Sequence, residues 1–252
     1  MASFRPRHAL LAAALAVAAT PALAEGPFSR TVFFGDSLTD AGFFRPLLVQ
    51  QAGPQAAVLG RFTANPGLVW ADHLPNFYGT NARPNGNGQA GDNYAVGGAR
   101  IVQVSIEELG PIPSLTAQAQ RYLGSTGGRA DKGALYTVWG GGNDLFAVAA
   151  NPSQAQAIIG AAVTAQVGLV GTLQAAGARY VLVPSIPDIG VTPSFSAQGP
   201  AAAAQGSGLA LAYNNALYGA LAGNGLRVIP LDTFHFLREA VANPSLFGFS
   251  NV

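Results

Sequence analysis

The stretch of residues 30–40 reads RTVFFGDSLTD. It opens with a run of β-branched and aromatic residues, which predicts a short buried strand. Gly35 and Asp36 end that strand, and Ser37 follows at the turn. A serine at a strand-to-helix turn can present its hydroxyl at the sheet edge, beside the free N–H groups of a helix start. On these residues alone, a helix-capping role for Ser37 is slightly favoured over a role as nucleophile.

Four segments downstream have a similar strand-like composition, at residues 93–96, 134–139, 179–183 and 226–231. Helical segments separate most of them, and the longest are the Ala-rich residues 153–176 and 200–222. This alternation predicts one α/β domain with a five-stranded parallel sheet covered by helices on both faces. In such sheets the site lies beyond the carboxyl ends of the strands.

Composition excludes several classes of function. Only 10% of the 252 residues are charged and the formal net charge is +1, so no electrostatic surface suited to nucleic acid is expected. The chain has no cysteine, which excludes disulfides, thiolate metal sites and a cysteine nucleophile.

Two further motifs follow predicted strands. Residues 93–99 (NYAVGGA) place two glycines after a strand, where a backbone N–H could approach a ligand closely. Residues 140–144 (GGGND) hold Asn143 on a glycine turn, where its amide could donate to an oxyanion, or where an Asx turn could cap the next helix. Asp144 fits the capping role better than a chemical one. Together with Ser37, the motifs supply a nucleophile and donors for acyl transfer.

These three motifs resemble, in order, the first three sequence blocks of the GDSL/SGNH family of serine esterases and lipases. Residues 61–71 (RFTANPGLVWA) and 184–193 (PSIPDIGVTP) are similar to segments of its secreted bacterial branch. The resemblance covers about the whole mature chain. It implies a flavodoxin-like, three-layer α/β/α sandwich and an enzyme that requires no organic cofactor and no metal.

The resemblance also implies roles for individual residues. Ser37 would be the nucleophile, and its own N–H, a glycine N–H and the Asn143 side chain would hold the oxyanion. Counting from the Asn of the second block favours Gly98 as that glycine, with Gly97 as the alternative.

The C-terminal region departs from the family pattern, which ends in an Asp-x-x-His-Pro block that supplies the base. Asp232 and His235 have the Asp-x-x-His spacing, but Phe236 follows instead of proline. Residues 231–252 instead resemble the helix and turn that precede this last block. We therefore expect residues 25–252 to be a C-terminally truncated GDSL/SGNH hydrolase domain, with His235 as base the alternative. His73, in a helical segment, is expected to be a helix-face residue.

The N-terminus is typical of a signal peptide over residues 1–24. Arg5 and Arg7 precede an uncharged apolar run at residues 9–19, and Ala-Leu-Ala at 22–24 precedes the expected cleavage site. The run is too short to span a bilayer, and Gly, Pro or polar residues interrupt each later apolar stretch. A secreted or periplasmic location is expected.

The sequence therefore predicts an exported serine ester hydrolase of the lipase, esterase or lysophospholipase type. It would form an acyl-enzyme at Ser37 on a small-molecule or lipid ester. Two alternatives are a catalytically inactive exported binding protein on the same fold and a carbohydrate-deacetylating esterase. In some family members an outer-membrane β-barrel follows the esterase domain, so a longer form of this chain could carry one.

Overall fold

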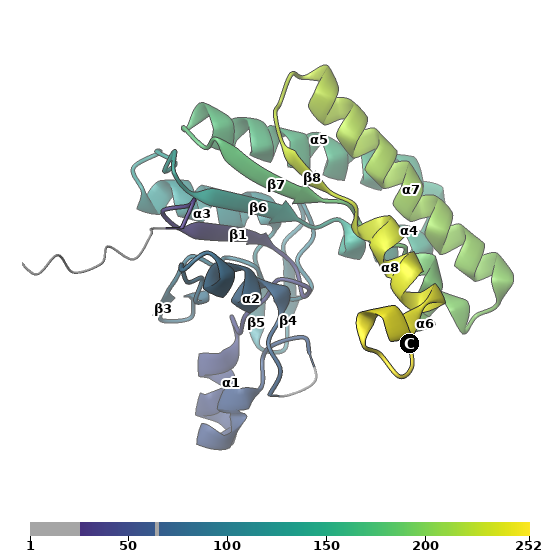
Figure 1. Ribbon diagram of the computed structural model, residues 1–252, viewed down its shortest axis with the longest axis horizontal. Coiled ribbons are helices and arrows are strands. Elements are labelled where there is room, and N and C mark those ends of the chain that lie inside the picture. Colours follow the sequence, from purple (N-terminus) through teal and green to yellow (C-terminus); the bar gives the residue numbers. More distant parts are fainter. Residues whose placement is uncertain (1–25, 64–65) are drawn as a thin grey trace, which may run out of the picture.

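The computed structural model describes residues 26–63 and 66–252. The predicted signal peptide lies outside the described residues. A parallel sheet of four strands forms the centre, in the order β1 (Thr31–Gly35), β6 (Leu135–Trp139), β7 (Tyr180–Pro184) and β8 (Ile229–Leu231) (Figure 1). The predicted α/β class and parallel sheet are confirmed, and four of the five predicted strands form.

The fifth predicted strand, residues 93–96, is only partly realised. It runs parallel to β1, because the Tyr94 N–H donates to the Phe33 carbonyl at 2.8 Å and the Val96 N–H to the Gly35 carbonyl at 3.1 Å. The ladder is limited to isolated bridges at Asn93, so the segment is not a regular strand and the predicted strand count was wrong by one. It nevertheless directs the glycines that follow it to the same sheet edge as Ser37.

One face of the sheet is fully covered by helices. These are α3 (Leu115–Ser125), α5 (Ala155–Ala175) and α7 (Pro200–Gly223), which pack side by side in one layer (Figure 1). Alternate strand residues, among them Phe34, Tyr136 and Val181, are completely buried beneath this layer. Burial of these large side chains from water is the main stabilising contribution to the fold.

The long apolar helix corrects two details of the sequence prediction. A short 3-10 turn, η2 (Pro152–Gln154), precedes α5, so Gln154 and not Ser153 occupies the N-cap position. Gly177 ends the helix with a φ of 120°, as predicted. The combined segment Pro152–Ala175, with mean hydropathy 1.5, is long and apolar enough to cross a membrane, contrary to expectation. Its packing against α4 (Gly142–Ala150) and α7 is that of a core helix.

The opposite face of the sheet is covered only in part. Helix α2 (Trp70–Phe77) lies over β1 and β6, where the Trp70 ring contacts Phe33 and Trp139 at centroid distances of 5.2 Å and 5.5 Å. Further along, Tyr180, Ile229 and Leu231 are 42%, 42% and 45% exposed. The register pairs Leu182 with Ile229, which places these side chains on the α2 face. Over β7 and β8 the third layer of the sandwich is therefore open.

The remaining elements surround the carboxyl ends of the strands or extend from the α2 side. They are α1 (Arg45–Ala52), η1 (Pro54–Val58), the hairpins β2 (Asn85–Gly86) with β3 (Gln89–Ala90) and β4 (Ser105–Glu107) with β5 (Gly110–Ile112), η3 (Ile189–Val191), α6 (Pro193–Ser196), α8 (Thr233–Ala242) and η4 (Pro244–Phe247). Figure 1 shows α8 and α6 beyond the carboxyl end of β8.

Candidate active site

Ser37 lies on a turn directly after β1. The backbone N–H groups of Thr39 and Asp40 both donate to the Asp36 carbonyl at 3.0 Å, which closes the turn. No helix starts there, since the next helix begins at Arg45, so the capping role for Ser37 is excluded. In the part of the chain that the structure describes, neither the Ser37 hydroxyl nor its N–H forms a hydrogen bond. Both groups are therefore free to act on a ligand.

Gly35 allows the turn to approach the neighbouring strand. A Cβ at this position would lie 2.9 Å from the Trp139 carbonyl oxygen and 2.9 Å from the Thr39 hydroxyl. Any larger residue would therefore force β1 away from β6 just before the serine. This close approach is the physical reason for a glycine two positions before Ser37.

Asp36 is a buried carboxyl group beside the serine. Its Oδ1 accepts a hydrogen bond from the Leu38 N–H at 3.1 Å. Burial, together with the nearby charges of Asp144 and Asp40, raises the pKa of Asp36 to about 7, against the lowering effect of the Leu38 hydrogen bond. Near neutral pH this group therefore changes charge beside the nucleophile.

The two glycines of the second motif differ in their hydrogen bonding. The Gly97 N–H donates to Asp40 Oδ2 at 2.8 Å, and Asp40 Oδ1 also accepts from Gly42 and Phe43. Gly98 has a φ of 80°, and among the described residues its N–H has no acceptor. The Gly97 donor is thus already used, whereas that of Gly98 is available. Sequence reasoning missed this role of Asp40, although its place three residues after Ser37 was a visible signal.

Asn143 lies on the first turn of α4, close to the second motif. Its Nδ2 donates to the Ala99 carbonyl at 2.9 Å, which ties α4 to the turn that contains Gly98. A side-chain amide has two N–H groups, so one remains for a ligand. The N-cap residue of α4 is Gly141, with a φ of 105°, so the alternative role of Asn143, an Asx cap of this helix, is not observed.

Asp144 likewise does not cap the helix. Its carboxylate accepts from the Ile101 N–H at 3.0 Å and from Arg100 Nε at 3.1 Å. The side chain is buried, and it fixes the segment after Gly98 against α4. The predicted capping role was wrong, and a positioning role takes its place.

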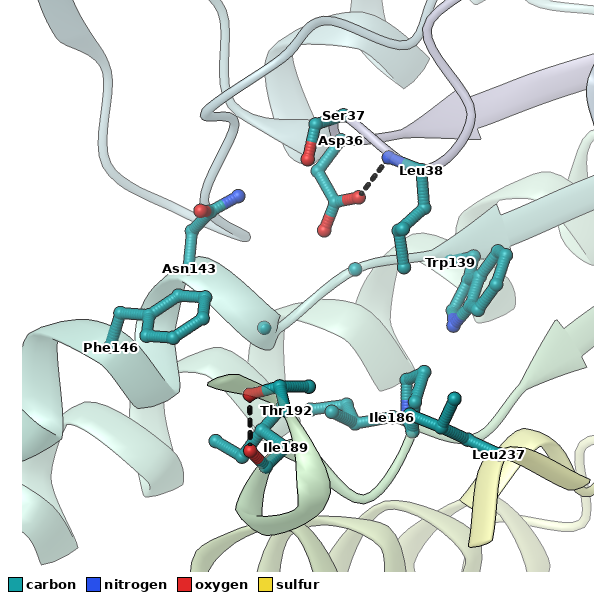
Figure 2. A pocket seen from close by; sticks show the side chains of 13 residues that line it. Asp36, Ser37, Leu38, Trp139, Asn143, Phe146, Ile186, Ile189, Thr192 and Leu237 are labelled. Atoms are coloured by element: carbon teal, nitrogen blue, oxygen red, sulfur yellow. Dashed lines mark hydrogen bonds between the residues drawn. The ribbon is translucent and has the colours of Figure 1, made fainter. Parts of the chain in front are cut away.

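A cavity of about 210 Å³ opens beside Ser37. Figure 2 shows Ser37 and Asp36 on one side, with Asn143 and Phe146 on α4, and Leu237 and Thr192 on the side away from Ser37. Most of the lining is apolar, and it consists of Asp36, Ser37, Leu38, Trp139, Gly140, Gly142, Asn143, Phe146, Ile186, Pro187, Ile189, Thr192 and Leu237. Among the described residues, no cluster of three His, Asp or Glu side chains is placed to hold a metal ion.

Neither histidine that the structure describes lines this cavity. His73 is exposed on α2, as expected for a helix-face residue. His235 lies in a different pocket with Ser185, Asn214 and Tyr218, and its side chain is 72% exposed. Asp232 is the N-cap residue of α8 and accepts from the His235 N–H at 3.0 Å, while its Oδ2 contacts His235 Nδ1 at 2.7 Å. The Asp-x-x-His spacing here is that of a helix cap.

Comparisons with known proteins point to one family. The family model described as GDSL-like Lipase/Acylhydrolase matches residues 31–238. Esterase EstA of Pseudomonas aeruginosa and esterase EstA of Pseudomonas putida are each 35% identical over 276 aligned positions, which cover 96% of this chain and 41% of theirs. Lipase 1 of Photorhabdus luminescens is 39% identical over 107 residues, 42% of this chain and 16% of its own. The chain thus spans about two fifths of the length of either esterase.

Proposed function

The chain belongs to the GDSL-like lipase/acylhydrolase family, and from this premise we propose that it hydrolyses carboxylic esters through an acyl-enzyme at Ser37. The observation that carries the proposal is the set of unused donors on Ser37 and Asn143, which line one cavity, and on Gly98, in the turn that the Asn143 side chain holds. The Ser37 hydroxyl, the Ser37 N–H and the Gly98 N–H have no partner among the described residues, and Asn143 keeps one free N–H. Free donors of this kind are what a developing oxyanion requires.

The reaction would proceed in two steps. The Ser37 oxygen attacks the ester carbonyl carbon while a base takes the hydroxyl proton, and the carbonyl oxygen becomes an oxyanion held by Ser37, Gly98 and Asn143. The C–O bond to the alcohol then breaks and the alcohol leaves with that proton. Water attacks the acyl-enzyme in the same manner, releasing the acid and restoring the serine.

We propose that the base comes from outside residues 26–252. Support comes from the placement of both described histidines away from the Ser37 cavity. His235 remains the alternative, because its pairing with Asp232 resembles the base and carboxylate of a catalytic triad.

The test is hydrolysis of a chromogenic short-chain ester by residues 25–252, with Ser37→Ala as the blank. Because the proposed base lies outside these residues, we expect little or no turnover from the folded protein. Turnover that Ser37→Ala abolishes and His235→Ala leaves intact would support the serine but contradict a base from outside residues 26–252. Turnover that both variants abolish would assign the base to His235. Turnover that is unchanged in Ser37→Ala would overturn the proposed nucleophile.

A catalytically inactive binding protein is the second candidate, favoured by the lack of a described histidine at the cavity. It predicts ligand binding without Ser37-dependent turnover, even in a longer form of the chain. Comparing acetylated sugars with acyl esters would test the carbohydrate-deacetylating alternative.

Export through residues 1–24 is likewise proposed. The supporting observation is the basic, apolar and small-residue order of that segment. Mass spectrometry of the protein recovered from the periplasm or medium should show Glu25 as the first residue. Retention of residues 1–24 on an exported chain would contradict the cleavage site.

A further inference from the structure

Three arginines line a cavity of about 420 Å³ on the opposite side of the sheet from α5 and α7, where Figure 1 shows α1 and α2. We call this cavity the arginine pocket. Arg45 is the first residue of α1, Arg61 follows η1, and Arg83 precedes β2. The other polar residues of the lining are Asp72, Asn76, Asn81 and Gln89. Of the described residues, none lines both this pocket and the Ser37 cavity, so the pocket is a separate site.

The positive charge of the arginine pocket exceeds its negative charge. Among the described lining residues Asp72 is the only acid, and Arg61 uses both of its oxygens: Nε donates to Oδ2 at 2.9 Å and Nη2 to Oδ1 at 3.1 Å. Asp72 Oδ2 also accepts from the Val69 N–H at 3.1 Å. Asp72 therefore neutralises Arg61, and the charges of Arg45 and Arg83 remain without a counter-charge in the lining.

Neither Arg45 nor Arg83 forms an ion pair in the part of the chain that the structure describes. Arg45 is half-buried and donates to the carbonyl oxygens of Ala41 at 2.8 Å and Leu59 at 3.4 Å, which carry no net charge. Burial, followed by the like charge of Arg61, lowers the pKa of Arg45. Arg83 is exposed. An anion in the pocket would therefore relieve repulsion between charges that the protein itself does not balance.

Asp40 does not supply the missing charge, although it lies near Arg45. Its carboxyl group is buried and does not line the pocket. Its oxygens accept from the N–H groups of Gly42, Phe43 and Gly97, and Arg45 forms no hydrogen bond with it among the described contacts. Burial raises the pKa of Asp40, which disfavours its charged form.

The composition of the pocket favours a phosphate group over a carboxylate. The N–H groups of a guanidinium form a planar fork that matches the oxygens of either anion. A phosphate monoester carries about 1.5–2 negative charges at pH 7, which corresponds to the two arginines without a counter-charge, whereas a carboxylate carries one. Asn76 and Asn81 add amide donors for oxygens of the ligand. The cavity is larger than a phosphate ion, so room remains for a small group that carries the phosphate.

We propose that the arginine pocket binds a phosphate group, with Arg45 and Arg83 as the residues that balance its charge. Arg61, held by Asp72, forms the wall between them and α2. The ligand class is a small phosphate, either the free ion or one carried on a hydroxylated organic group. This site goes beyond the proposed function, since it requires neither Ser37 nor an ester.

Calorimetric titration of the full chain tests the proposal, in a phosphate-free buffer of low ionic strength. The four ligands are inorganic phosphate, glycerol 3-phosphate, acetate and glycerol. Both phosphates should bind more tightly than acetate, glycerol should not bind, and added sodium chloride should weaken phosphate binding because salt screens the charges. Tighter binding of glycerol 3-phosphate would identify an esterified phosphate as the ligand, and tighter binding of inorganic phosphate would identify the free ion.

Arg83→Gln is the decisive variant, because Arg83 is exposed and its loss should leave the fold intact. Removing one charged hydrogen-bond donor should weaken phosphate binding by about tenfold or more, and Arg45→Gln should have the same effect. Arg129→Gln is the matched control, since Arg129 is an exposed arginine after α3 that does not line the pocket. Equal melting temperatures of Arg83→Gln and Arg129→Gln without phosphate would show that the lost affinity does not come from misfolding.

Three results would each overturn the proposal. They are the absence of binding by both phosphates, acetate binding as tight as phosphate binding, and equal phosphate affinity in Arg83→Gln and Arg129→Gln. Because the readout is binding and not turnover, these results leave the proposed ester hydrolysis at Ser37 untouched.

Discussion

Gln118 holds the backbone of Gly35 on both sides of the residue. Its Oε1 accepts from the Gly35 N–H at 2.9 Å, and its Nε2 donates to the Gly35 carbonyl at 2.9 Å. Gln118 comes from α3 and is 1% exposed. The end of β1, two residues before Ser37, is thereby fastened to a core helix.

Replacing Gln118 by alanine should destabilise the fold. The buried Gly35 N–H would lose its acceptor, and such a loss costs about 1–3 kcal/mol, whereas the Gly35 carbonyl keeps the hydrogen bond from the Val96 N–H. Urea unfolding should show a free energy of unfolding lower by at least about 1 kcal/mol. Gln120→Ala, at an exposed position of the same helix, is the control and should have little effect. Equal free energies of unfolding for the two variants would contradict a stabilising role of the Gln118 hydrogen bonds.

Asp36→Asn should change how stability depends on pH. The folded pKa of Asp36, about 7, is above its ordinary value of 3.8, so the folded state binds the proton more tightly than the unfolded state. Stability contributed by this group is fully present below pH 3.8 and is lost as pH rises to about 7, at no more than about 1.4 kcal/mol per unit. The variant should therefore gain stability relative to the wild type as pH rises through this range. Melting curves from pH 4 to 8 would test it, and parallel pH profiles would contradict it.

Asn143→Ala should reduce Ser37-dependent ester hydrolysis. Removing one oxyanion donor lowers kcat by about 10²–10³-fold. The value of KM should change much less, because the amide acts mainly on the charge that develops during the reaction. Asn151→Ala, at the exposed end of the same helix, is the matched control. A variant with a raised KM and an unchanged kcat would show that Asn143 binds substrate without stabilising the oxyanion.

Asp232→Ala should destabilise helix α8 and leave ester hydrolysis unchanged. Asp232 caps the helix, and loss of such a cap costs about 1 kcal/mol. The hydrogen bond from the His235 N–H, together with the His235 side chain, lowers the pKa of Asp232. The stability that this lowered pKa contributes is present above the ordinary carboxyl pKa and is lost on acidification. The variant and the wild type should therefore converge in stability at low pH. Hydrolysis that disappears in this variant would instead support Asp232 and His235 as the catalytic pair.

The sequence was sufficient for the class of fold and for the order of the motifs. Strands at residues 31–35, 135–139, 180–184 and 229–231 form near the predicted positions, since compact apolar runs bounded by glycines or loops are strong local signals. The prediction was wrong for residues 93–96, where strand-like composition meets only isolated bridges. Local composition does not reveal whether a neighbouring strand continues the ladder.

The detail of the candidate site depended on contacts that are distant in sequence. The family resemblance favoured Gly98 over Gly97, but the residue types at 93–99 do not give the physical reason, which is the hydrogen bond from the Gly97 N–H to Asp40, fifty-seven residues away. The hydrogen bonds between Gln118 and Gly35 join residues that are eighty-three positions apart. Motifs identify which residues are chemically suitable, whereas packing decides which of their donors remain free.

The short strand β8 gives the sheet an edge of low local stability. Its three residues are all exposed, whereas β1 is completely buried, so amide hydrogen exchange should be faster in β8 than in β1. Helix α8 follows β8 directly but is fastened to Ser185 and Asp188, in the segment after β7. Fraying that starts at Ile229 should therefore stop at Leu231, whose carbonyl accepts from the Ser185 N–H at 2.9 Å. Amide exchange should accordingly be slower at the start of α8 than in β8, although the two are neighbours in the sequence.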